Sequence, residues 1–333
     1  MHGRKNSCRF VALFTAILLF LCSLSGCGQV AQEVPSDSIS TVNGEEGVTF
    51  QDARGNTVTL KSWDRVISLY GSFAEMWTLA GGELIGVTED AVEERQMTLG
   101  EHVEIIGSVK SPNLEAVLAL EPDFVILSAD IATQVDLESA LKEAKVPFAY
   151  FRVDTFEDYR SLLERFCTLT GRSDLYEEYG GKVQAKIEAI KALAAEEEHP
   201  TGLLIRAFST GAKAKGTDHQ AGVMLEDLGV DNIVSRHESL LEDLSIEEII
   251  EEDPDYIFIT TMGSEDAALE ALENGIMANP AWSGLTAVQE GHWYVLPKEL
   301  FHYKPNARWG ESYAYLAKLL YPQLTEEVDE IMA

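Results

Sequence analysis

Cysteine and basic side chains are both scarce in this chain of 333 residues. Its 25 lysines and arginines face 56 aspartates and glutamates, which gives a formal net charge of −31. A surface this acidic repels polyanions, so the composition argues against a nucleic-acid partner. Three of the four cysteines fall within the first 27 residues, and Cys167 is the only one beyond them. No disulfide framework is available, and the fold must be stabilised by burial of apolar surface.

Motifs of the common enzyme classes are also missing. The chain has no Gly-x-Ser-x-Gly elbow and no Gly-x-x-x-x-Gly-Lys phosphate loop, and the glycines from Gly81 to Gly86 do not form a dinucleotide fingerprint. The string Thr217-Asp218-His219 could be drawn as part of a hydrolytic site. Such a string in a loop is more typical of a turn, because a nucleophile and its base must meet in space. The sequence therefore predicts that the protein is not an enzyme and has no resident cofactor.

The histidines do not form a recognisable metal motif. The six histidines from position 102 onward show no His-x-His or His-Glu-x-x-His spacing and no His-rich run. A bare divalent metal would need ligands from distant loops, with His102, His219 and His302 as the candidates. No metal site is predicted.

The N-terminus has the features of an export signal. Three basic residues and no acid precede an almost wholly apolar run from Phe10 to Leu24. This run is shorter than the roughly 20 residues that span a bilayer, and it ends in Leu24-Ser25-Gly26-Cys27, which resembles the lipobox of bacterial lipoproteins. The resemblance implies cleavage before Cys27 and a lipid on its sulfur; the alternative is an ordinary signal peptide with an incidental cysteine. Cleavage would leave 307 residues with a net charge of −34.

The rest of the chain divides into two similar halves. Short apolar runs of strand type alternate with helical patterns in each half, which favours largely parallel sheets covered by helices on both faces. Between Phe156 and Glu198 there is no proline, and apolar residues recur at helical spacing. We therefore expect an α/β protein with two Rossmann-like lobes, joined by a long connecting α-helix, with a ligand cleft between them. The predicted segments are a signal peptide (1–26), the lipidated Cys27 with a flexible tether (27–47), an N-terminal lobe (48–154), a helical connector (155–199) and a C-terminal lobe (200–333).

One unit of sequence occurs once in each half. Residues 114–127 align with residues 246–259 at a constant offset of 132, and both read as a short helix, an acid-Pro-Asp turn and an apolar strand. The turn is common chemistry before a strand. Glu115 and Glu247 occupy the same place in the first turn of each helix, where the helix dipole favours an acid. Capping could explain one of them, but the matched pair indicates a function.

Together these segments resemble the iron-siderophore, haem and cobalamin class of substrate-binding proteins, class III of the ABC importers. The similarity runs from Val48 to the C-terminus and includes a Val-Ile-Ser-Leu strand before a Ser-x-x-Glu helix and the long connector. Ser72 and Glu75 of that helix also fit a capping box. The resemblance implies that Glu115 and Glu247 dock into basic pockets of the two permease subunits, and that the lobes close only slightly on the ligand.

Candidate ligand contacts follow from position. In open α/β sheets ligands bind beyond the carboxyl ends of the strands, and the segment from Phe301 to Trp309 concentrates aromatic and basic residues in an acidic chain. Arginine pairs with carboxylate or catecholate oxygens, and aromatic faces cover a ligand ring. The alternative is that Trp309 packs in the core while Arg308 and Lys304 pair with nearby acids. The predicted ligand contacts are Tyr70, Ser72, Phe73, Arg206, Phe208, Tyr303, Lys304, Arg308 and Trp309.

The sequence thus predicts a monomeric receptor, anchored by lipid to the outer face of the cell membrane. It would capture an iron chelate, a ferric siderophore in the first place, and deliver it to an ABC permease dimer. Haem and a corrinoid such as cobalamin remain open as ligands, and a receptor for bare divalent metal or a lipoprotein hydrolase are the further alternatives. The sequence identifies neither the chelate nor the permease.

Overall fold

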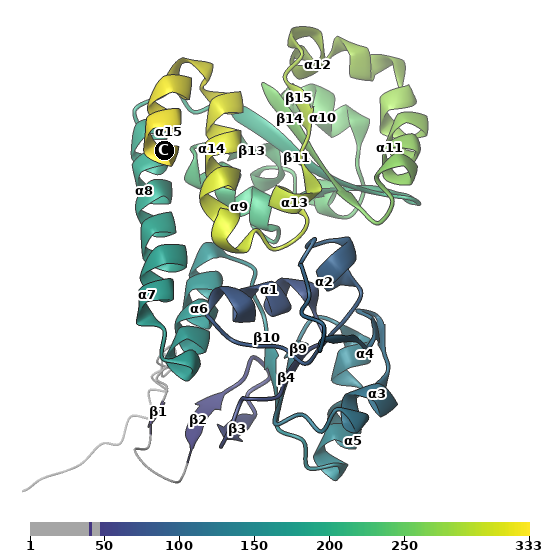
Figure 1. Ribbon diagram of the computed structural model, residues 1–333. Coiled ribbons are helices and arrows are strands. Elements are labelled where there is room, and N and C mark those ends of the chain that lie inside the picture. Colours follow the sequence, from purple (N-terminus) through teal and green to yellow (C-terminus); the bar gives the residue numbers. More distant parts are fainter. Residues whose placement is uncertain (1–39, 42–46) are drawn as a thin grey trace, which may run out of the picture. The chain divides into compact units, whose positions relative to one another are not determined.

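The computed structural model describes residues 40–41 and 47–333 (Figure 1). The predicted signal peptide, Cys27 and most of the predicted tether lie outside this part of the chain. Two tether residues, Ser40–Thr41, form β1, which pairs antiparallel with β2 (Val48–Gln51). Within the described ranges no helix combines the length and the apolarity that crossing a bilayer requires.

The first lobe is built on a five-stranded sheet with the order β10-β9-β4-β5-β6, in which every neighbouring pair is parallel. Alternate residues of the central strand β9 (Phe124–Ser128) enter two separate apolar clusters: Phe124 and Ile126 on one face, Val125 and Leu127 on the other. Because both faces are covered, the strand is apolar throughout. The prediction of a parallel sheet covered on both faces is confirmed. The other elements are β3 (Thr57–Leu60), β4 (Val66–Ser68), α1 (Gly71–Leu79), β5 (Gly86–Val87), α2 (Asp90–Glu93), β6 (Glu104–Ile105), β7 (Gly107–Ser108), β8 (Ser111–Pro112), α3 (Leu114–Ala119), α4 (Ala132–Val135), α5 (Glu138–Glu143) and β10 (Phe148–Phe151).

The connector is helical but not a single α-helix. α6 (Phe156–Thr170) begins with a capping box between Thr155 and Asp158 and ends at Gly171, whose φ of 71° is left-handed. α7 (Ser173–Tyr176) then runs through a π-helical turn (Glu177–Gly181) into α8 (Lys182–Ala194). α6 packs on α1 of the first lobe, and α8 packs on α14 and α15 of the second (Figure 1). The connector therefore belongs to the core of both lobes.

The second lobe is also built on a mainly parallel sheet, but one of its edge strands is antiparallel. Its sheet has the order β12-β11-β14-β15, in which β11 (Thr201–Phe208), β14 (Tyr256–Met262) and β15 (Trp293–Val295) are parallel and β12 (Gly211–Lys215) is an antiparallel edge strand. The remaining elements are α9 (Gln220–Asp227), β13 (Asp231–Asn232), α10 (Ile246–Glu252), α11 (Glu265–Asn274), α12 (Thr286–Glu290), α13 (Lys298–Phe301), α14 (Trp309–Leu320) and α15 (Thr325–Met332), with 3-10 turns that include Asn306–Arg308.

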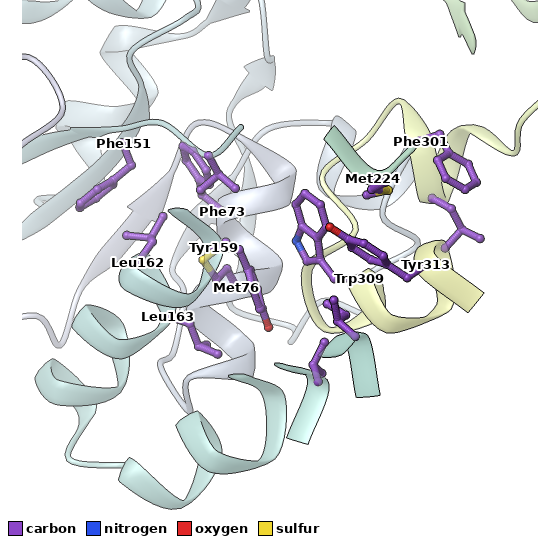
Figure 2. Packing of buried hydrophobic residues seen from close by; sticks show 14 of the residues in the cluster. Phe73, Met76, Phe151, Tyr159, Leu162, Leu163, Met224, Phe301, Trp309 and Tyr313 are labelled. Carbon is purple, nitrogen blue, oxygen red and sulfur yellow. The ribbon is translucent and has the colours of Figure 1, made fainter. Parts of the chain in front are cut away.

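One apolar cluster runs through both lobes and the connector. It contains Phe73 of α1, Tyr159 of α6 and Trp309 of α14, all of which Figure 2 shows. Trp309 is 1% exposed, and its ring centroid lies 5.9 Å from that of Phe156. Because a packed core resists deformation, a cluster shared in this way holds the two lobes in a fixed relation.

Candidate functional site

A small hollow of about 140 Å³ lies where the two lobes meet. The second lobe supplies most of its wall: Arg206 near the carboxyl end of β11, the turn that leads into α9, and the segment after α13. The first lobe supplies Asp154, which follows β10. These are the carboxyl ends of parallel strands, where a ligand was expected. The lining residues are Asp154, Arg206, Thr217, Asp218, His219, Gln220, His302 and Lys304.

Arg206 is the unusual side chain of this hollow. Its Nη2 donates to the sulfur of Met262 at 3.1 Å, and its Nε is buried without a hydrogen-bond partner in the described part of the chain. No carboxylate of the described residues forms an ion pair with it within 4.0 Å, and burial lowers its pKa. Even a partly buried cation is costly when no anion lies beside it. An anion bound in the hollow would therefore be electrostatically favoured.

Two imidazoles stand beside this guanidinium. Burial, and then the charge of Arg206, lower the pKa of His219 to about 3 and that of His302 to about 4, so both are neutral near pH 7. His219 Nδ1 accepts the backbone N–H of Ala221 at 3.2 Å. The proton of the neutral ring must therefore be on Nε2, which makes that atom a donor.

The loop that carries His219 packs tightly onto α9. A Cβ at Gly222 would lie 1.9 Å from the carbonyl oxygen of Gly216, so only glycine allows this approach. Gln220, at 7% exposure, donates through Nε2 to the carbonyl of Tyr303 at 2.9 Å. This bond ties the start of α9 to the segment that carries His302 and Lys304. The walls of the hollow are thus fixed to each other by buried contacts.

The acids of the hollow are already engaged. Asp154 pairs with Lys304 across the lobes at 3.3 Å. Asp218 pairs with Lys215 at 2.5 Å and accepts the backbone N–H of Gly216 at 2.9 Å. Asp218 therefore closes a turn, as expected for the Thr217-Asp218-His219 string. Arg206 feels the charge of Asp218 but forms no ion pair with any carboxylate of the described residues.

A larger hollow of about 650 Å³ also joins the lobes. Tyr303 forms part of its wall, so the segment from Lys298 to Lys304 borders both hollows. The Nζ of Lys298 lies 5.6 Å from the centroid of the Tyr303 ring and donates to the Gly263 carbonyl at 2.6 Å. Acids are frequent here, and burial followed by the charge of Asp90 raises the pKa of Glu94. The lining residues are Glu75, Glu93, Glu94, Arg95, Gln96, Glu265, Pro297, Lys298, Glu299, Tyr303 and Arg308.

A buried polar network fixes the back of this hollow. Asn306, which is 0% exposed, donates through Nδ2 to the carbonyl of Ser72 at 2.9 Å and to the carboxylate of Glu75 at 2.5 Å. Glu75 also pairs with Arg95. The capping box predicted for Ser72 and Glu75 is wrong, because α1 begins one residue earlier, at Gly71, and its N-cap Tyr70 makes no side-chain cap bond. Glu75 joins the lobes instead.

The predicted ligand contacts lie in several places. Arg206 and Lys304 line the small hollow, and Tyr303 and Arg308 line the large one. Arg308 pairs with Glu311 at 2.9 Å. The structure does not bring the other predicted contacts to these walls. Ser72, Phe73 and Trp309 are buried, with 2%, 1% and 1% of their surface exposed. Tyr70 packs edge-on against Phe73, with the ring centroids 5.0 Å apart. Phe208 lines a third hollow of about 640 Å³, together with Glu247.

In the segment before and at the start of α14, the structure shows core packing and ion pairs, which was the alternative to ligand binding. Trp309 belongs to the shared core, Arg308 pairs with Glu311, and Lys304 pairs with Asp154. Burial raises the pKa of Tyr70 to about 12, so its phenol stays protonated. The roles of these residues toward a ligand stay predictions.

Two of the three histidines considered as ligands for a bare metal ion lie close together. His219 and His302 line one hollow, whereas His102 lies in the loop after Gly100 of the first lobe. Among residues 40–41 and 47–333, no group of three or more His, Cys, Asp or Glu side chains is placed to hold a metal ion.

The internal repeat has the same backbone in both lobes. Glu121 and Asp253, 132 residues apart, are both left-handed, with φ of 46° and 41°. Asp123 accepts the backbone N–H groups of Asp64 and Arg65 before β4, each at 3.0 Å. Asp255 accepts both the N–H and the hydroxyl of Thr201 at the start of β11. The second acid of each turn therefore anchors the neighbouring parallel strand.

The glutamates of the repeat are exposed and do not cap their helices. Asn113 caps α3 and Ser245 caps α10, each by accepting a backbone N–H. Glu115 and Glu247 project from the first turns of these helices. Both glutamates lie in the first helical turn, where the helix dipole favours an acid, and their docking role stays a prediction.

Sequence reasoning missed several residues of the site. His219 and His302 were not among the predicted ligand contacts, and neither were Gln220, Arg95 and Asn306. The available signal was position, because Arg95 follows β5 and His302 follows β15. Gln220 and Asn306 act through partners more than 80 residues away in sequence, which no local pattern can reveal.

Known proteins resemble this chain in sequence and fold. A family model described as "Periplasmic binding protein" matches residues 66–300. The petrobactin-binding protein YclQ of Bacillus subtilis is 25% identical over 304 residues, with 87% of this chain and 90% of YclQ covered. The Fe(3+)-citrate-binding protein YfmC of the same organism is 22% identical over 295 residues, with the same shares covered.

Solved structures show the same fold. Staphylococcus aureus IsdE, solved with heme, superposes with a TM-score of 0.64 at 18% identity, and 78% of this chain and 98% of IsdE are covered. Vibrio cholerae BtuF, a vitamin B12 binding protein, gives a TM-score of 0.60 at 19% identity, with 77% and 96% covered. The two α/β lobes with the cleft between them are thus the periplasmic-binding-protein fold. Because the family model covers most of the chain, the protein belongs to the periplasmic binding protein family and is an extracytoplasmic binding protein.

Proposed function

We propose that this protein captures a ferric siderophore and delivers it to an ABC permease dimer, acting as a monomeric receptor without catalytic activity of its own. The observation that carries the proposal is Arg206, a guanidinium in the cleft between the lobes with a buried Nε and no ion-pair partner in the described chain. Carboxylate or catecholate oxygens of a ferric chelate would supply the negative charge that this guanidinium does not meet among the described residues. A corrinoid offers little negative charge to this group.

The cleft also suits a ligand with an aromatic or flat part. Tyr303 presents its ring in the large hollow, next to Lys298 and opposite residues of the first lobe. Arg308 and Lys304, each paired with an acid at the rim, could exchange that acid for a chelate oxygen. The volume of about 650 Å³ falls in the range of ~300–1,000 Å³ that is usual for small-molecule sites.

We propose further that a lipid on Cys27 anchors the protein to the outer face of the cell membrane. The support is the apolar run to Leu24 followed by Ser25-Gly26-Cys27. Labelled fatty acid should be incorporated by the wild-type chain, and a Cys27→Ala chain should remain unlabelled. Equal labelling of both chains would contradict the anchor.

Titration of the purified protein with chelates tests the ligand class. Intrinsic tryptophan fluorescence would be followed as ferric siderophores with carboxylate, catecholate and hydroxamate arms, haem, cobalamin and bare divalent metals are added. Saturable quenching at sub-micromolar concentration by a ferric siderophore, weakened by Arg206→Gln, is the expected result. Tighter binding of haem or cobalamin than of every siderophore would show that the ligand is wrong. Binding of bare metal alone would move the site to the histidines.

A further inference from the structure

The small hollow differs from the rest of the cleft in size. Its volume of about 140 Å³ compares with about 650 Å³ for the hollow on the other side of Tyr303. One water occupies ~30 Å³ of liquid volume, so the small hollow has room for a few water-sized groups and not for a complete chelate. A ligand that fills the large hollow could send one short arm into the small one, because the segment from Lys298 to Lys304 borders both.

The small hollow also differs in its donors. Arg206 has a buried, unpartnered N–H, and His219 carries its proton on Nε2 because Nδ1 accepts from Ala221. His302 lines the same wall, and Lys304 stands at the entrance with Asp154. Asp218, the other acid, is held by Lys215 and by the N–H of Gly216. The lining thus offers a fixed cation and neutral donors to a small anion, while its own carboxylates are occupied.

We propose that this hollow is a subsite for one carboxylate arm of the chelate, bound by Arg206 with His219 and His302 as further donors. The proposal rests on the proposed function, since it concerns the same ligand. It adds the chemical class: the preferred chelate has a carboxylate or hydroxycarboxylate arm. A chelate with only hydroxamate arms would leave the Arg206 guanidinium without a counter-charge, and a desolvated site left unpaired discriminates strongly against such a ligand.

The segment with His302 is held in place independently of the ligand. The bond from Gln220 Nε2 to the Tyr303 carbonyl links α9 to this segment, and Gly222 permits the close contact of the loop before α9. The donors are therefore preorganised, which reduces the entropy cost of binding a short, rigid anion.

Binding measurements on the complete protein test the subsite. The probes are ferric citrate, the ferric complex of a linear trihydroxamate, and metal-free citrate, each titrated by calorimetry at pH 7. The variants are Arg206→Gln and His302→Phe. The control is Lys213→Gln on β12, where Lys213 pairs with Glu242 at 3.3 Å and does not line the hollow. An unfolding curve for each variant confirms that the protein is folded.

The wild-type protein should prefer ferric citrate to the ferric trihydroxamate. Arg206→Gln should weaken ferric citrate by about 10- to 100-fold, as the loss of a charged hydrogen-bonding group predicts. His302→Phe should weaken it by several-fold, and Lys213→Gln should leave it unchanged. Equal affinity of Arg206→Gln and the wild-type protein for ferric citrate, or tighter binding of the trihydroxamate, would overturn the subsite while leaving the siderophore function intact.

Metal-free citrate separates the two proposals. If no ferric chelate binds but citrate binds weakly and Arg206→Gln removes this binding, the siderophore function is overturned and the carboxylate subsite is supported. If neither citrate nor any chelate binds, both proposals are overturned.

Discussion

Replacing Asn306 by alanine should destabilise the protein markedly, because this buried residue links the lobes. Its side-chain amide donates to the Ser72 carbonyl at 2.9 Å and to the Glu75 carboxylate at 2.5 Å, and its backbone is left-handed with φ of 53°. The first bond contributes ~1 kcal/mol and the second, to a charged group, ~2 kcal/mol. Asparagine tolerates the left-handed region better than alanine does, so the exchange costs ~1 kcal/mol more at this position.

One term acts in the opposite direction. The Oδ1 of Asn306 is buried without a partner in the described part of the chain, and its removal returns ~1 kcal/mol. The net loss in the free energy of unfolding for Asn306→Ala is therefore about 3 kcal/mol. Urea unfolding followed by tryptophan fluorescence measures it, and one transition is expected because the core is shared by both lobes.

Gln96 provides a matched control. It has the same φ of 53° but is exposed. Gln96→Ala should change the free energy of unfolding by less than ~0.5 kcal/mol. An effect of Asn306→Ala as small as that of the control would refute the assignment of Asn306 as a buried link between the lobes.

Three further predictions follow from the cleft and the repeat. Arg206→Met should raise the free energy of unfolding by ~1 kcal/mol, because it removes a buried, unpartnered N–H; a less stable variant in urea would contradict this. His219 and His302 have folded-state pKa values of about 3 and 4, below the unfolded value of ~6.5, so the unfolded state binds more protons. Urea unfolding at pH 7, 6 and 5 should show the free energy of unfolding decreasing as the pH is lowered, by up to ~1.4 kcal/mol per pH unit for each imidazole. The decrease should be less steep in His302→Gln, and an unchanged slope in that variant would count against the buried neutral ring. Replacing Glu115 and Glu247 together by glutamine should lower cellular uptake and leave ligand affinity intact, and normal uptake would make the pair purely structural.

Local patterns predicted most of the elements. The strand Phe124–Ser128 occupies the predicted residues because a strand buried on both faces is continuously apolar. The connector was predicted as helical, but its detail depends on packing. Gly171 ends α6, whereas Gly180 and Gly181 are carried within a π-helical turn.

The candidate site was predictable in part. Arg206, Tyr303, Lys304 and Arg308, which were predicted from their position at or after the ends of parallel strands, line the two hollows, and their contact with a ligand stays a prediction. Trp309 was expected at the ligand but lies in the core, since a sequence does not show which way a side chain at a helix start is turned.

The sequence by itself determined the alternation of strands and helices, the repeat and the single cysteine of residues 47–333, because these depend on residue type and short-range order. Only the tertiary structure decided which charges are paired. The carboxylate that each cation meets is set by distance in space, as the ion pairs of Lys304 with Asp154 and of Arg95 with Glu75 show. The same holds for Arg206: that no carboxylate of the described residues pairs with it depends on its folded surroundings and cannot be seen in the order of residues.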